Sequence, residues 1–478
     1  QIRHLLSGQP FQLTSWLENF EQEGRYPAIR KAIRKKELEE LPEEVWHEWD
    51  DPRKVFWWFW RCYPEVIAKE IPETQLLPAD TRIPDVSLWS HCSMTSALAG
   101  ALAGYFSRPE EYPQKGKPFE RSRPFLVTFT FTPIQEVIQA SRKMRDFWAG
   151  SWALHYLSAK VCWALAKKYG PDTFIYPCLY DQPLIDHWLR QEYPDFDAWL
   201  PNANQPGPQQ TRLLTAGFPN VLVMVLPNNG QGLEDGGPIA SAMQHAEQIL
   251  QGSWQDLGKR VLDKLKGREQ VWRDIYLKLW DNWLASQWQL YWTASPLGDY
   301  KSALNQSPSK TEEFYQWSAS QNKLACPDEP LFQEGVAEDL FLREVMNLVT
   351  YKQPNCNVGS WWGSLVNQLR INLQGLKNGR TWQLPTAIGP RSTISGIGPV
   401  LRKPAEDLQH SEWAKESETR QFWQHHAGMF DGIEELNATE VVKRGLHQVL
   451  GDVLNLDQRS GKIPVLYPDL SSGVAGWL

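Results

Sequence analysis

One stretch decides the fold: Phe125-Leu-Val-Thr-Phe-Thr-Phe131, with the helical run that follows it. β-Branched and aromatic residues nearly alternate over these seven positions, which predicts a strand. Pro133 ends the strand, because proline has no N–H to donate to a sheet. From Ile134 to Lys168 apolar residues recur at helical spacing, and we expect this helix to be interrupted near Gly150.

Two further strands and a second helix follow along the chain. Thr173–Tyr176 and Val221–Leu226 are predicted strands, and Pro238–Gln251 is a predicted helix. The order strand-helix-strand-strand-helix is the beginning of a ferredoxin-like unit. We therefore predict an α+β fold, with a ferredoxin-like unit of βαββαβ type embedded in large helical regions.

Composition and turn residues divide the chain into five predicted segments. These are an N-terminal helical region over 1–115, the ferredoxin-like unit over 116–252, a helical region over 253–350, an irregular insertion over 351–410 and a helical segment over 411–478. In the first segment, Ser87 is the expected cap of a buried helix that runs to Phe106. In the third, six tryptophans between Trp254 and Trp292 have the spacing of one apolar helix face.

The charge balance limits how the chain can bind nucleic acid. Its 478 residues carry 49 Lys+Arg and 56 Asp+Glu, a formal net charge of −7. Binding through bulk positive charge is therefore excluded, and only local basic clusters remain. Those clusters are Arg30–Lys36, Arg142–Arg145, Arg402-Lys403 and Lys443-Arg444. We expect most of the 25 tryptophans to lie in cores and subunit interfaces rather than to stack on bases.

Cysteine usage and apolar runs bear on the compartment. No two of the six cysteines lie within three residues of each other, so a CxxC-type zinc knuckle is absent. Their low number favours a reducing compartment, and we expect a cytoplasmic protein. No segment approaches 18 uninterrupted apolar residues, so we expect no transmembrane helix.

The motifs of several common enzyme classes are missing from the sequence. It has no G-x-x-x-x-G-K-[ST], G-x-G-x-x-G, G-x-S-x-G or H-E-x-x-H motif. The sequence shows no nucleophile–base pair that would support a hydrolase. We interpret His425-His426 as a surface pair and Asn437-Ala-Thr439 as the start of a helix.

The helical half of the opening stretch is the candidate binding site. It has Gln135 at its start and Arg142, Lys143 and Arg145 within one turn. Backbone N–H groups and cationic side chains in such a place hold a phosphate or a nucleobase edge. The alternative is a solvated charged face, in which Asp146 pairs with Arg142 or Arg145.

The stretch from Phe129 to Ser151 resembles the first palm domain of the large subunit of type III CRISPR effector complexes, in particular the type III-B, or Cmr, complex. Other segments agree with that family in the same order, and the resemblance covers most of residues 75–478. They are Leu77–Pro84, Ser87–His91, Thr95–Ala99, Ile175–Pro177, Gln182–Asp186, Arg391–Gly396 and Phe430–Leu446. The resemblance implies that the ferredoxin-like unit is a palm.

The resemblance implies a function. In that family the large subunit is a scaffold of an RNA-guided antiviral complex and binds ATP between two palms. The second palm carries a Gly-Gly-Asp-Asp motif, uses Mg or Mn, and makes cyclic oligoadenylate when target RNA is bound.

This chain has no Gly-Gly-Asp-Asp and no His-Asp dipeptide, so we expect the central part of such a subunit, without its HD domain and second palm. The implied role is a non-catalytic half-pocket and subunit contacts, with other subunits, guide RNA and target RNA as partners. Whether the chain is an enzyme stays open, because the family is a nucleotidyltransferase but no catalytic motif is present.

The resemblance also implies which residues contact a nucleotide, RNA or a partner. The implied nucleotide contacts are Gln135, Ser141, Arg142, Asp146, Ser151 and Asp186. Contacts to RNA or a partner are expected from His91, Lys143, Arg145, Lys443 and Arg444, with a structural role as the alternative for His91. The family's four-cysteine zinc ribbon would fall in 351–410, where Cys356 is the single cysteine, which argues against zinc. The alternative function is a helical scaffold protein with a ferredoxin-like platform and no nucleotide site.

Overall fold

The computed structural model describes residues 2–3, 10–11, 41–43, 45, 49–70, 74–75, 77–80, 83–104, 122, 124–200, 212–229, 237–297, 360–379, 389–404, 415–424, 430 and 432–456. The chain divides into two compact units. The first comprises Gln1–Pro124, Leu165–Gln205 and Met224–Gly230. The second comprises Phe125–Ala164, Pro206–Val223 and Gln231–Leu478.

The first unit is mostly helical. It contains α4 (Pro52–Arg61), α5 (Tyr63–Glu70), α6 (Leu88–Ala103), α9 (Pro183–Glu192) and the 3-10 helices η3 (Pro171–Thr173) and η4 (Pro194–Ala198). Helix α4 begins where the Asp51 side chain accepts a hydrogen bond from the N–H of Arg53, with proline at its first position. The buried Trp58 of α4 packs edge-on against Trp199, which follows η4. Aromatic packing of this kind joins segments distant in sequence into one core.

The predicted N-terminal helical region is wrong in part. It contains two short pairs of strands, β1 (Ile2–Arg3) with β2 (Pro10–Phe11) and β3 (Pro78–Asp80) with β4 (Ile83–Ser87). Helix α6 follows Ser87, whose side chain caps it as predicted. The helix is less buried than predicted: among its residues only Ala97 and Ala101 are buried. Its apolar residues lie all around the helix, so no single packing face can cover them.

The second unit is organised around strand β5 (Pro124–Thr132), whose first eight residues are buried. Strand β5 pairs antiparallel with β8 (Gln289–Pro296) from Phe125↔Pro296 to Thr132↔Gln289. The complete sheet has the order β6 (Phe174–Tyr176), β7 (Val221–Pro227), β5, β8. In the chain, α8 (Met144–Tyr169) lies between β5 and β6, and α11 (Pro238–Arg268) lies between β7 and β8.

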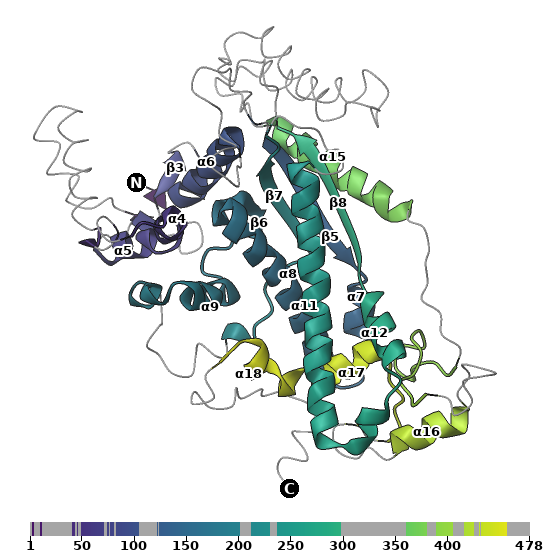
Figure 1. Ribbon diagram of the computed structural model, residues 1–478. Helices are drawn as coiled ribbons and strands as arrows, with labels where there is room; N and C mark the ends of the chain where they lie inside the picture. Colours follow the sequence, from purple (N-terminus) through teal and green to yellow (C-terminus); the bar gives the residue numbers. More distant parts are fainter. Residues whose placement is uncertain are drawn as a thin grey trace, which may run out of the picture. The chain divides into compact units, whose positions relative to one another are not determined.

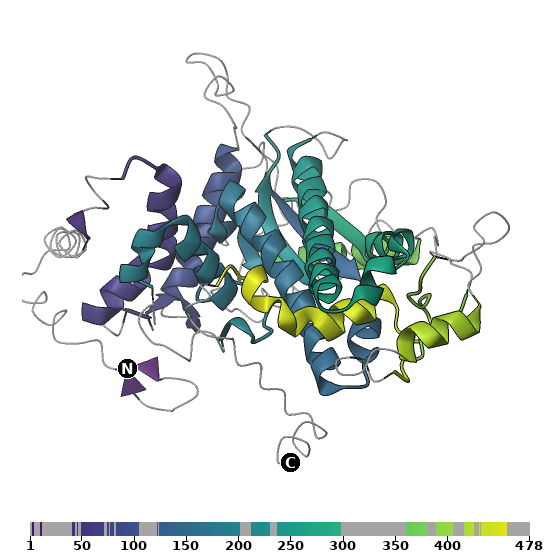
Figure 2. The same cartoon turned by 60° about the horizontal axis from the view of Figure 1, so that its bottom comes forward.

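Several helices complete the second unit; its α-helices are labelled in Figure 1, and Figure 2 turns the same view so that its bottom comes forward. They are α7 (Gln135–Gln139), α12 (Leu277–Ala285), α15 (Ser360–Asn378), α16 (Glu416–Gln424), α17 (Ala438–Gly445) and α18 (Leu450–Val453), with η5 (Gln270–Asp274) and η6 (Leu446–Gln448). Helix α17 packs against both α11 and α12, and α15 packs against β8. Trp272 of η5 stacks edge-on with Phe422 and Trp423 of α16, as expected for tryptophans in a core.

The helix predicted for 134–168 is two helices. The break falls between α7 and α8, at Ala140–Lys143, and not near Gly150, through which α8 runs without interruption. Ala140 leaves the helical conformation with ψ at 67°. No glycine or proline marks this break in the sequence, which is why the pattern placed it elsewhere.

Two elements are absent from the prediction. Strand β8 includes Trp292, which we had assigned to a helix face, because pairing with β5 decides its conformation. Helix α15 lies within the predicted irregular insertion. Its Leu365, Leu369 and Leu373 are buried at four-residue spacing, and this face stabilises the helix despite the surrounding Gly and Asn. Among the described residues, no helix has the length and apolar character to cross a membrane.

Candidate functional site

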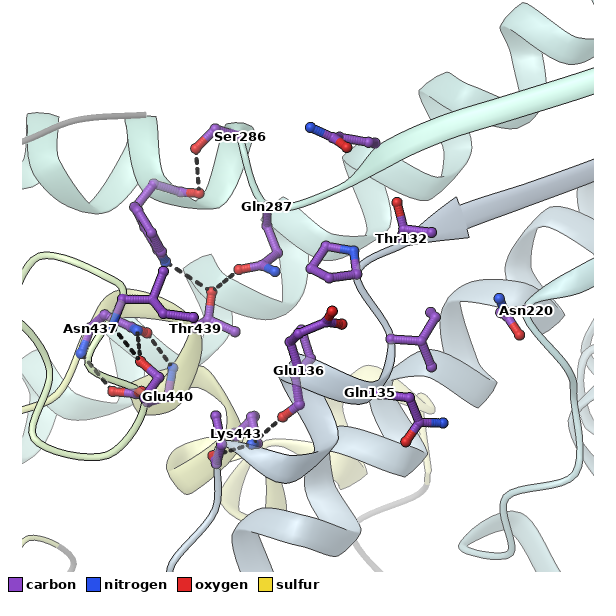
Figure 3. A pocket seen from close by; sticks show the side chains of 18 residues that line it. Thr132, Gln135, Glu136, Asn220, Ser286, Gln287, Asn437, Thr439, Glu440 and Lys443 are labelled. Atoms are coloured by element: carbon purple, nitrogen blue, oxygen red, sulfur yellow. Dashed lines mark hydrogen bonds between the residues drawn. The ribbon is translucent and has the colours of Figure 1, made fainter. Parts of the chain in front are cut away.

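A cavity of about 680 Å³ lies at the end of β5, within the second unit (Figure 3). Most of its lining comes from three parts of the chain: the end of β5 with α7, the junction of α12 with β8, and the start of α17 with the loop around Ser395. Asn220, from a fourth part, also lines it. Figure 3 shows Glu136, Gln287 and Thr439, one residue from each wall, directed toward the space between them. The cavity is within the usual size range for small-molecule sites.

The end of the sheet supplies one group of polar side chains. Pairing of β5 with β8 puts Thr132 opposite Gln289, and both line the cavity. Asn220, just before β7, donates from its side chain to Thr130 Oγ1 at 3.3 Å. The end of the sheet therefore presents amide groups next to β7 and β8, the two strands that flank β5.

A hydrogen-bond chain connects α12 to α17. Trp283 Nε1 donates to Thr439 Oγ1 at 3.2 Å, and the Thr439 hydroxyl donates to Gln287 Oε1 at 2.5 Å. Thr439 uses only the oxygen of the Gln287 amide. The two N–H groups of that amide are not engaged by described residues and can donate to a ligand.

The start of α17 is fixed by a capping box. Asn437 Oδ1 accepts from the N–H of Glu440 at 2.9 Å, and the Glu440 carboxylate accepts from the N–H of Asn437 at 3.0 Å. The Ser392 hydroxyl also donates to Glu440, at 2.6 Å. The loop approaches closely at Gly398, where a Cβ would lie 2.5 Å from Asn437 Nδ2 and 2.8 Å from Trp283 Cζ2. Only glycine fits at this position.

A buried ion cluster lies next to the cavity. Arg444 is 0% exposed and donates to both carboxylate oxygens of Asp146, at 2.7 and 2.5 Å, and to Glu434 at 2.7 Å. The neighbouring Lys443 lines the cavity and is 1% exposed. Burial lowers the pKa of Lys443 to about 8, although Asp146 and Glu440 favour its charged form.

The expected nucleotide contacts have different surroundings in the structure. Of the six, Gln135 lines the cavity. Ser141 donates to Ile138 O at 2.7 Å, and Arg142 donates to Thr393 O at 3.2 Å. Ser151 lies half-buried on α8.

Asp146 and Asp186 are both in buried ion pairs. Asp146 is bound by Arg444, a partner from α17 that the sequence pattern did not indicate. Asp186, in the first unit, accepts from Arg61 at 2.8 and 2.7 Å.

The residues expected to contact RNA or a partner differ in exposure. Lys443 and Arg444 are buried with partners in this chain, so neither side chain is exposed for such a contact here. His91 is exposed on α6, and Lys143 and Arg145 are half-buried near the start of α8. Arg402 is 4% exposed, so Lys403 is the exposed cation of the Arg402-Lys403 cluster. The cluster Arg30–Lys36 and Cys356 lie outside the described residues.

The lining suits an uncharged polar ligand better than a phosphate. Helix α7 has five residues, so its dipole contributes little. Lys443, the cation among the described lining residues, is engaged by α7. Amide side chains recur in the lining, and they bind the edges of planar heterocycles. No group of three or more His, Cys, Asp or Glu side chains that could hold a metal occurs in the described part of the chain.

Sequence reasoning missed most of the lining. The missed polar residues are Thr132, Glu136, Asn220, Ser286, Gln287, Gln289, Ser395, Asn437, Thr439 and Glu440. A signal was present in the amides that sit at the ends of predicted strands, such as Asn220 before Val221. Nothing in one sequence indicates that α17 closes the same cavity.

The fold and the cavity define a class: an α+β domain whose central strand ends at an amide-lined cavity closed by a distant helix. Within it, residues 126–259 match the family model described as CRISPR-associated protein Cmr2, N-terminal. The resemblance to the large subunit of type III-B complexes is thereby confirmed for this stretch, which runs from β5 into α11.

Two comparisons extend the match. The CRISPR system Cmr subunit Cmr2 of Pyrococcus furiosus is 30% identical over 168 residues, which are 31% of this chain and 17% of the relative. A solved chain of the type III-B Cmr-beta complex in its apo state superposes with a TM-score of 0.52 at 16% identity, covering 97% of this chain and 44% of that chain. At this identity the superposition supports the fold alone. The chain spans less than half the length of these relatives.

Proposed function

We propose that this chain is part of a Cmr2-like large subunit of a type III-B CRISPR complex and that its sheet is a ferredoxin-like palm. The strand order β6-β7-β5-β8 supports the palm, because α8 and α11 connect the strands in the βαββαβ order of that fold. Its partners would be the other subunits of the complex, a guide RNA and a target RNA, in the cytoplasm. The match over residues 126–259 supports this assignment.

Within that subunit, the cavity is the part of a nucleotide site that this chain contributes. The observation that carries the proposal is the pattern of the lining: the amide side chains of Gln135, Asn220, Gln287 and Gln289 surround the space, and its lysine is bound to α7. Asn and Gln side chains pair with the edge of adenine through two hydrogen bonds. The base and ribose would therefore bind here, and the phosphates would be held by groups outside this cavity.

The chain by itself would not turn over ATP. Transfer of a nucleotidyl group by two metals needs carboxylates that hold both cations. Glu440, the buried carboxylate of the lining, is engaged by Ser392 and Asn437. Mg or Mn would act with a second palm of the parent subunit, and this chain would supply a non-catalytic half-pocket and subunit contacts.

Titration of the 478-residue chain with adenosine, ATP and inorganic triphosphate tests the proposal. Adenosine and ATP should bind with affinities within about threefold of each other, and triphosphate should not bind. Binding at 100 times the dissociation constant would stabilise the fold by about 2.7 kcal/mol, which a thermal shift detects.

Two variants of α7 locate the ligand. Gln135→Leu, which changes a lining residue, should weaken adenosine binding at least tenfold. Gln139→Leu, at an exposed position on the same helix outside the lining, should leave it unchanged. A folded chain that binds neither adenosine nor ATP would favour the alternative, a scaffold whose ferredoxin-like unit is only a platform.

A further inference from the structure

Lys443 is placed to act on helix α7 rather than on a ligand. Its ammonium group donates to Val137 O at 2.5 Å, to Ala140 O at 2.6 Å and to Ser141 Oγ at 2.8 Å. An ammonium group has three N–H donors, so all of them are in use. No proton of Lys443 remains for a ligand in the cavity.

The three acceptors lie at the C-terminal end of α7. Carbonyl groups in the last turn of a helix have no partner within the helix, and a cation there is favourable. An isolated helix as short as the five-residue α7 does not form in water, so packing and these bonds must hold it. Its first turn carries Gln135 and Glu136, which line the cavity.

The protein makes room for this contact at Gly150 of α8. A Cβ at that position would lie 3.2 Å from Lys443 Cε, 3.4 Å from Ile138 Cα and 3.4 Å from Val137 O. The lysine stem therefore passes between α8 and α7 where a side chain is absent. The adjacent Arg444 fixes the stem, because its bonds to Asp146 hold α17 on α8.

We propose that Lys443 is a positioning residue of the cavity: it fixes α7 in the orientation that presents Gln135 and Glu136 to the ligand. The inference rests on the proposed function, since it assigns a role in binding to a residue that does not touch the ligand. Lys443 lines the cavity, where a lysine would ordinarily be expected to bind a phosphate. The proposal assigns it a different role.

The test compares Lys443→Met with the unchanged chain at pH 7. Methionine keeps the apolar stem and removes the donors. Adenosine affinity should fall at least tenfold, and ATP affinity by the same factor. Hydrogen exchange at the α7 amides should accelerate at least tenfold without ligand, while exchange in β5 stays unchanged. Lys259→Met, at an exposed position on α11, is the matched control and should change none of these.

A second variant reaches the same contact from the other side. Gly150→Ala leaves every hydrogen-bonding group in place but pushes on Lys443 and α7, and it should also accelerate α7 exchange and weaken adenosine binding several-fold. It replaces Lys443→Met as the test if that variant does not fold.

The outcomes are distinct. Weakened ATP binding with unchanged adenosine binding in Lys443→Met would mean that the lysine contacts phosphate, and would overturn the inference. Unchanged exchange in α7 would also overturn it. If the unchanged chain binds neither ligand, the proposed function fails; exchange in the ligand-free variants still decides whether Lys443 positions α7.

Discussion

Each compact unit contains a fully buried arginine that binds an aspartate through two hydrogen bonds. In the first unit, Arg61 binds Asp186 and also contacts Glu65 at 3.3 Å and Asp181 at 3.2 Å. The side chains of Glu65 and Asp181 are 20% and 45% exposed, so water reaches this cluster.

The second unit holds its arginine in a drier place. The side chains of Asp146 and Glu434 around Arg444 are 4% and 3% exposed. The same buried arginine–aspartate pair therefore has two different structural roles in the two units. The Arg61 cluster ties helices together at a hydrated edge, whereas the Arg444 cluster fixes the helix that closes a cavity. The variants below test this difference.

The largest effect is expected from Arg444→Met. It removes the cation that both buried carboxylates share and leaves only the weaker contacts of Glu434 with Arg142, at 3.8 Å, and of Asp146 with Lys443. The free energy of unfolding should therefore fall by about 5 kcal/mol. Urea denaturation at pH 7, followed by tryptophan fluorescence, measures it. Adding Asp146→Asn should recover part of the loss; a loss below about 2 kcal/mol in the single variant would contradict a dry cluster.

Arg61→Met should cost less, about 3 kcal/mol, because two of its three carboxylate partners, Glu65 and Asp181, are partly exposed and can regain hydration. The same denaturation experiment checks it. If the two arginine variants lose equal stability, the distinction between a hydrated and a dry cluster is wrong.

The pH dependence of stability sharpens the comparison, because the Arg444 cluster has Lys443 beside it. Burial lowers the pKa of Lys443 to about 8 from an ordinary value near 10.5, so between these values the unfolded state binds more protons. This contribution to stability therefore rises with pH, by about 2 kcal/mol from pH 8 to 10.

The measurement is the difference in unfolding free energy between the unchanged chain and Lys443→Met at several pH values. The difference removes titrations common to both proteins. Asp146, Glu440 and Arg444 face the lysine and are retained in the variant. A difference that stays flat from pH 8 to 10 would show that the lysine pKa is not lowered.

The smallest effect is expected at the start of α17. Asn437→Ala removes the helix cap and should lower the free energy of unfolding by about 1 kcal/mol. Urea denaturation measures this as well. Asn378→Ala, at the last residue of α15, is a control outside the capping box, and equal losses in both would argue against a specific role of the cap.

The fold was predictable where local pattern and tertiary context agree. The alternation in Phe125–Phe131 predicted β5, and Ser87 and Asn437 begin helices as expected. Strand β8 was missed because its partner, not its own pattern, determines its conformation.

The site was predictable only in part, for a related reason. Gln135 follows directly from the turn after β5, whereas Asp146 binds an arginine 298 residues further along the chain. Charge at a helix start looks the same in a sequence whether it serves a ligand or a buried ion pair. Burial decides between these, and burial depends on where distant segments pack.

Gly398 has a consequence for how this sequence can diverge. Its missing side chain admits Asn437 and Trp283, so a larger residue at 398 is tolerable only if those two positions shrink in the same lineage. Among homologous sequences these three positions should therefore change together or not at all. An alignment deep enough to measure covariation should show that positions 283, 398 and 437 covary.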